Sequence, residues 1–262
     1  MMHDLTLFKT FATILTFLAG LMGGAWPLFR RYHYQITPQH DEHYHGTLEF
    51  PSAEAIAAGI FLAAGLLDML ATSTHTFMDA GYHYPFSYLI ASITFLILLG
   101  LEHAAEHLKE KGTYLISSVA VLTAIILIIH SFLEGLAVGV NSSFSVTFIL
   151  FLAIIAHKSA DSFALTAILS KSALSLGWIF LLFLILIGMT PFGILLGNYA
   201  FMTNHNNLWI PIFTALAAGT FLYMGTLHGF ERASLIHRCC NLKEFILMLL
   251  GFATMAVVSI WT

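Results

Sequence analysis

Long apolar stretches recur along the whole chain, separated by short polar ones, and are typical of membrane-spanning helices. A helix needs about 20 residues to cross the roughly 30 Å of hydrocarbon in a bilayer, and these stretches have that length. They lack the alternation of barrel strands, and lipid tolerates no unpaired backbone groups, which leaves helices as the spanning element. The pattern predicts eight spans at approximately residues 5–29, 53–73, 85–107, 114–139, 145–169, 174–199, 208–230 and 243–262.

The polar connections are too short to hold a soluble domain, so we predict one all-α membrane domain over residues 1–262. The first apolar stretch is too long for a signal peptide and follows no basic segment, so we expect it to stay as the first span. The longest connection is rich in histidine, with His33, His40, His43 and His45. Such a tract either captures metal weakly or serves as a plain linker.

Composition strengthens this prediction. Hydrophobic residues make up 58% of the chain and charged residues only 9%, whereas soluble proteins carry roughly 25% charged residues. A water-soluble surface cannot be built from this composition. We expect the lipid bilayer to be the main partner and expect no nucleic-acid binding.

Basic residues mark the cytoplasmic side, because Lys and Arg near span ends are retained there. Only the first, third, fifth and seventh connections carry them: Arg30, Arg31, Lys109, Lys111, Lys171, Arg232, Arg238 and Lys243. Both termini are therefore predicted to lie outside the cytoplasm. Lys9 is expected to snorkel from the outer edge of the first span, and Lys158 is the one basic residue that no connection explains.

Ionisable residues inside the predicted spans are the candidates for function, because a charge at mid-bilayer costs about 3 kcal/mol on insertion scales. His130 and Glu134 lie one turn apart in the fourth span, with Asn141 on the same face. His157 and Asp161 form a second such pair in the fifth span. Two pairs on facing helices supply enough imidazole and carboxylate ligands for one zinc ion or a first-row neighbour.

The alternative is that each pair is only a buried hydrogen-bonded contact. Two pairs near the middle of consecutive spans favour the metal site, because carriers place their substrate there. Asp68 in the second span and His228 in the seventh leave two interpretations open: a residue on the metal path or a polar residue near a helix end. Glu102, His103, Glu106 and His107 are better explained as a solvated end of the third span.

Two segments carry a resemblance to a known family. HSFLEGLAVG in the fourth span and AHKSADSFAL in the fifth resemble the metal-binding spans of ZIP (zinc/iron permease, ZRT/IRT-like) transporters, in the branch with HS...E and HK motifs. AGIFLAAGLLDML, MTPFGILLG and AAGTFLYMGTLHGFE are similar to further family spans in the same order. The resemblance implies an eight-helix bundle in which spans 1–3 and 6–8 form an inverted repeat around spans 4 and 5.

The resemblance also implies roles for individual residues. His130, Glu134, His157 and Asp161 match the central transport site of the family, Asp68 matches an acid of the second span, and His228 stands where an acid lies near the exit. This chain departs from relatives that bind two metals. Lys158 replaces a bridging acid, Ser131 replaces an Asn ligand, and Thr190 occupies a position where an acid can stand.

These departures predict a single metal ion. An ammonium at Lys158, close to Asp161 on the same helix, can offset negative charge that a second cation would otherwise balance. We therefore predict that Lys158 tunes the charge of the site and does not ligate the metal.

We predict a transporter, not an enzyme, which moves a divalent metal into the cytoplasm by alternating access. Zinc fits best, with Fe²⁺, Mn²⁺ and Cd²⁺ as alternatives, and the membrane is a plasma membrane or a bacterial inner membrane. The rival is an intramembrane zinc or iron metalloenzyme with the same ligands, although no further acid or base candidate accompanies them. A retinal on Lys158 conflicts with its metal-type neighbours, and a homodimer is one option for the oligomeric state.

Overall fold

The computed structural model describes residues 2–36, 50–110, 116–141, 143–172, 174–200, 208–228 and 242–261. This part of the chain is helical and contains no strand. The helices are α1 (Met2–Ile36), α2 (Pro51–Ala63), η1 (Ala64–Met69), α3 (Leu70–Asp79), α4 (Phe86–Glu110), α5 (Ile116–Val140), α6 (Phe144–Ser170), α7 (Leu176–Ala200), α8 (Trp209–Tyr223), η2 (Met224–His228) and α10 (Leu242–Val258). The predicted all-α membrane fold is confirmed, whereas His40, His43 and His45 lie outside the described residues.

Three of these elements, α2, η1 and α3, follow one another without a break and form one span, and so do α8 and η2. The described residues thus contain eight helical stretches. Among the described residues, six helices are long and apolar enough to cross a membrane, and residues 210–226 form a shorter apolar helix. The first two stretches extend beyond the predicted spans, to Ile36 and Asp79. A helix can continue beyond the apolar residues that cross the hydrocarbon, so the hydropathy pattern locates the middle of a helix but not its ends.

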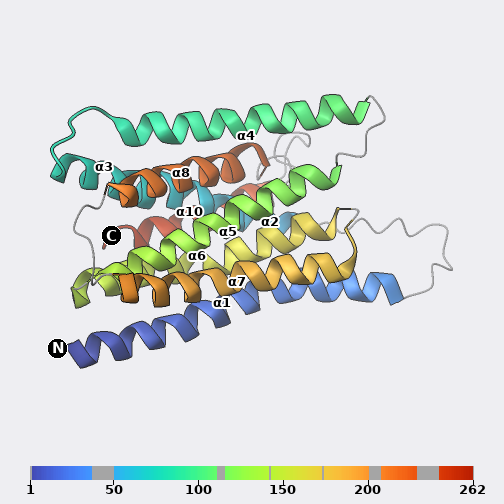
Figure 1. Ribbon diagram of the computed structural model, residues 1–262. Coiled ribbons are helices and arrows are strands. Elements are labelled where there is room, and N and C mark those ends of the chain that lie inside the picture. The colour runs from blue at the N-terminus through green and yellow to red at the C-terminus, as the bar shows by residue number, and fades with distance from the viewer. Residues whose placement is uncertain are drawn as a thin grey trace.

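The two termini lie at the same end of the bundle (Figure 1). We call this end the termini face, and the end at which α2 and α10 begin and α6 ends the opposite face. Large apolar side chains are exposed around the helices, among them Phe29 at 65% and Leu195 at 63%. An exposed apolar surface of this kind is what lipid covers.

Close packing divides the helices into two groups, because backbones approach closely only where small residues line the contact. In the first group, an added Cβ at Gly23 of α1 would lie 2.1 Å from Ser159 O of α6, and at Gly135 of α5 2.2 Å from Thr190 O of α7. We call α1, α5, α6 and α7 the site group. The remaining helices, which we call the frame group, have equivalent contacts between α2 and α10 and between α4 and α8.

Two short π-helical segments, η1 and η2, interrupt the second and seventh spans. Each has glycine as its second residue, and each glycine lies against the other span: Gly65 near Ala218 O and Gly225 near Ala58 O. Phe61 and Phe221 meet at the same crossing with ring centroids 4.9 Å apart. A π-helical turn changes the direction of the side chains that follow it and is frequent at functional sites.

Lys9 differs from its prediction. Its side chain does not snorkel to the edge of the membrane but is buried, with 5% exposed. The ammonium donates hydrogen bonds to Gly139 O at 2.7 Å and to Asn198 Oδ1 at 3.1 Å. It thereby joins α1 to the end of α5 and to α7, where a positive charge also complements the helix dipole of α5.

The close packing of α5 on α7 generates a first prediction. Gly193→Ala in α7 places a Cβ 2.3 Å from Phe132 O and forces the helices apart. We expect this to cost about 1–3 kcal/mol of stability, measured as a lower midpoint of thermal unfolding in detergent. Gly188→Ala in the same helix is the control, because its Cβ meets no atom within 4 Å. Equal midpoints for the two variants would contradict this packing argument.

Candidate metal site

The site is built by two neighbouring helices of the site group. His130 and Glu134 lie one turn apart on α5, and His157 and Asp161 lie one turn apart on α6. One ligand atom of each residue lies within 4.8 Å of the ligand atoms of the other three. The two pairs predicted from sequence therefore converge on one point, with side chains that are buried or nearly so.

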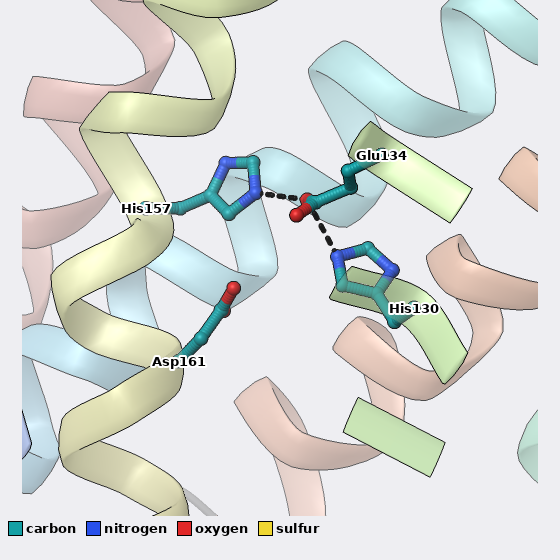
Figure 2. Close-up of side chains that lie close together, drawn as sticks. All are labelled: His130, Glu134, His157 and Asp161. Carbon is teal, nitrogen blue, oxygen red and sulfur yellow. Dashed lines mark hydrogen bonds and ion pairs between the residues drawn. The ribbon is translucent and has the colours of Figure 1, made fainter. Parts of the chain in front are cut away.

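Glu134 is at the centre of this cluster (Figure 2). Its Oε1 lies 2.7 Å from His130 Nε2 and also contacts His157 Nε2, with the two rings on opposite sides of the carboxylate. Two nitrogens and a carboxylate oxygen thus point at one another from separate helices. This is the donor set that zinc prefers, and one ion placed between the donors would replace these contacts with metal bonds.

Asp161 completes the cluster but bonds to nothing in the described part of the chain. Its side chain is fully buried, and neither carboxylate oxygen has a hydrogen-bond partner there. The carboxylate points towards the space between the two imidazoles (Figure 2). A buried charge without a partner is costly, so this arrangement is suited to a cation that Asp161 helps to bind.

Lys158 lies beside this cluster and is also fully buried. Its ammonium donates a hydrogen bond to Ser131 Oγ at 2.7 Å and lies 3.8 Å from Glu134 Oε2. The described ion pair of Lys158 is therefore with Glu134 on α5, whereas the sequence suggested Asp161 on its own helix. Thr190 supports the same corner, because its hydroxyl donates to Ser131 O at 3.0 Å.

A cavity of about 510 Å³ reaches the cluster from the side of the termini face. Its lining begins with Asp68, His130, Glu134 and His157 and continues to residues near the termini face, among them Thr76, Asn141, Val146 and Ile210. Asp68 belongs to η1, so the π-helical segment carries this acid to the inner end of the cavity. The backbone of His228 ends η2, but its side chain is outside the described residues.

The other side of the cluster is covered by an aromatic ring. Phe221 of α8 has no exposed surface, and its ring centroid lies 4.4 Å from that of His130 and 5.3 Å from that of His157. No feature of the sequence indicated this contact, because nothing distinguishes one phenylalanine from the other apolar residues of its span. Glu102 was predicted to be solvated, yet it accepts a hydrogen bond from Tyr223 at 2.7 Å.

Comparison with known proteins decides which family this geometry belongs to. The profile of the ZIP zinc transporter family matches residues 6–118 and 113–259. The chain belongs to the ZIP zinc transporter family. Human zinc transporter ZIP2 is 27% identical in an alignment 259 positions long, gaps included, that covers 79% of this chain and 84% of ZIP2.

Two other proteins match over shorter segments. Protein zntD of Dictyostelium discoideum is 35% identical over 173 residues, 62% of this chain but only 25% of zntD. Zinc transporter ZIP1 of Danio rerio is 32% identical over 130 residues, 49% of this chain and 43% of ZIP1. The family consists of transporters, not enzymes, which favours metal transport over the metalloenzyme alternative.

Metal binding to this ZIP chain tests the role of the unpaired carboxylate. Asp161→Asn keeps the shape of the side chain but removes its charge, so we expect zinc affinity to fall at least about ten-fold in equilibrium binding to purified protein. Asp79→Asn is the matched control, since Asp79 is exposed at the end of α3. Equal affinities of the two variants would exclude Asp161 as a ligand.

Proposed function

We propose that His130, Glu134, His157 and Asp161 form the central transport site for one divalent metal ion, foremost zinc. The observation that supports this proposal is the convergence of the four donors within 4.8 Å at the inner end of a cavity that extends towards the termini face. Both donor pairs lie near the middle of their helices, the depth at which carriers bind their substrate. Imidazole nitrogens favour zinc, while the carboxylates also tolerate Fe²⁺, Mn²⁺ and Cd²⁺.

The direction of transport follows from the charges of the connections. Lys109, Lys171 and Lys243 lie at or near the opposite face, and basic residues near span ends are retained in the cytoplasm. The termini face and the mouth of the cavity are then outside, and the ion travels past Asp68 to the site. We assign His228, at the end of η2, to the exit path towards the cytoplasm.

We attribute alternating access to a movement of the site group against the frame group. Every described glycine whose added Cβ would meet another helix below 3.0 Å makes that contact within one group. Contacts between the groups rely on side chains, such as Phe221 against the two imidazoles. Tightly packed groups with a looser boundary can shift as two bodies, which would expose the site first outside and then inside.

The proposed site holds one ion, because Lys158 already supplies a positive charge where a second cation would lie. Its distance of 3.8 Å from Glu134 Oε2 supports a role in tuning the charge of the ligands. Residues 1–262 then act as one membrane domain, in a plasma membrane or a bacterial inner membrane. A homodimer is compatible with this mechanism but is not required by it, since all four ligands come from one chain.

Zinc uptake into proteoliposomes tests the transport site. We expect His130→Ala and His157→Ala to reduce the initial rate of uptake at least about ten-fold, because each removes an imidazole ligand. His75→Ala is the matched control, since His75 is exposed near the end of α3, and it should keep the wild-type rate. Unchanged uptake in both site variants would refute the transport proposal.

Replacement of Lys158 tests the charge-tuning role. Lys158→Met removes the ammonium beside Glu134, so the ligands keep more negative charge and should bind zinc several-fold more tightly. Tighter binding should also slow release and lower the maximal rate of uptake. Lys243→Met is the charge-matched control, because Lys243 is exposed in the first turn of α10 and should leave zinc affinity at equilibrium unchanged. Weaker zinc binding in Lys158→Met would show that the ammonium does not act through charge.

A further inference from the structure

An ion pair joins the two helix groups at the opposite face. The Lys171 ammonium donates a hydrogen bond to Glu54 Oε1 at 2.6 Å. Glu54 lies in the first turn of α2, in the frame group, and Lys171 is the capping residue at the end of α6, in the site group. The transport site does not use either residue, so the pair needs a separate explanation.

The environment of the pair favours a strong but single interaction. Only 6% of the Glu54 side chain is exposed, against 29% for Lys171, and Glu54 Oε2 has no hydrogen-bond partner in the described part of the chain. Each charge also lies at the helix end that its dipole favours, the carboxylate at an N-terminus and the ammonium at a C-terminus. Lys171 is therefore the described partner of the Glu54 carboxylate. If the two side chains move apart, the interaction between the helix groups at this point is lost.

The pair lies beneath an apolar seal. Lys171 follows Asp161 by ten positions, a rise of about 15 Å along the helix. Over this distance the buried side chains Leu165, Ile168 and Leu169 belong to the same apolar cluster as Phe61 and Ala57 of α2. The cavity does not enter this region, because none of its lining residues lies closer to the opposite face than the site itself.

We propose that Glu54 and Lys171 form a latch that holds the cytoplasmic side closed while the site is open to the outside. This inference rests on the proposed transport function. An ion can leave towards the opposite face only if the two helix groups separate. The apolar contact between α2 and α6, which we call the seam, blocks this path while the groups are together. The latch spans that seam, so it must break once in each transport cycle.

The competing explanation is a static contact that only stabilises the fold. In that case the groups would part along another seam, for example between α5 and the helices α4 and α8, and the ion pair would persist throughout the cycle. The two explanations differ in what a covalent link between α2 and α6 does to transport.

A reversible cross-link distinguishes them. Glu54→Cys and Lys171→Cys are combined in a protein in which Cys239 and Cys240 are replaced by Ser, and the pair is oxidised with copper phenanthroline. We expect oxidation to reduce zinc uptake into proteoliposomes at least about ten-fold, a reductant to restore it, and zinc to bind the oxidised protein with unchanged affinity. Thiol counting confirms that the cross-link has formed.

The control places the same cross-link inside one group. Ser73 of α3 and Ser87 of α4 are buried with their hydroxyl oxygens 2.8 Å apart, and both belong to the frame group. Oxidised Ser73→Cys/Ser87→Cys should transport zinc at the rate of its reduced form. An oxidised Glu54→Cys/Lys171→Cys protein that also keeps its reduced rate would overturn the latch.

A second measurement covers the case in which the reduced double variant is itself inactive. Ala57→Cys reports on the seal, since Ala57 is 5% exposed and lies one turn from Glu54 on α2. When Glu54→Gln is added, the rate at which the cysteine at position 57 is alkylated from the cytoplasmic side should rise several-fold. Without the ion pair, α2 and α6 separate more often and expose this cysteine. An unchanged rate would overturn the latch, whereas failure of the wild-type protein to take up zinc would refute the transport function instead.

Discussion

The structure depends on one constraint: ionisable side chains inside a bilayer need partners, because lipid supplies none. Glu134 meets this constraint with two imidazoles, one from its own helix and one from the neighbouring helix, and with the Lys158 ammonium. Asp161 does not meet it within the described residues, since both of its oxygens remain unpaired. A cation that visits this cluster would satisfy the remaining charge, which is the physical basis for reading it as a cargo site.

The same constraint explains how the helices are packed. Small residues bring α1 onto α6 and α5 onto α7, so that α5 and α6 present their ligands to each other from a rigid support. Lys9 strengthens this support where α5 ends, by binding a backbone carbonyl and a side-chain amide from two other helices. Rigidity within the site group allows a group to move as a whole and carry the ligands in a fixed arrangement.

Membership of the ZIP family explains the helical membrane fold. The residues in which this chain differs from the family's two-metal pattern lie together in the structure. Lys158, Ser131 and Thr190 form one hydrogen-bonded corner beside the ligands. The Lys158 side chain occupies this corner with no exposed surface and lies 3.8 Å from Glu134 Oε2.

The sequence by itself predicted the helical class, a number of spans that matches the eight described helical stretches, and the four donors that converge in the structure. It did so because lipid imposes about 20 apolar residues on each span and makes every ionisable residue within a span conspicuous. Helical periodicity alone placed Glu134 one turn from His130, and Asp161 one turn from His157.

Only the tertiary structure decided which helices lie against one another and which partner each charge takes. Lys158 meets Ser131 and Glu134 on another helix, Lys9 turns inward, and Phe221 covers the imidazoles from the frame group. The pairing of Glu54 with Lys171 joins residues 117 positions apart. Such contacts depend on the packing of apolar surfaces that look alike in sequence, so periodicity and composition could not specify them.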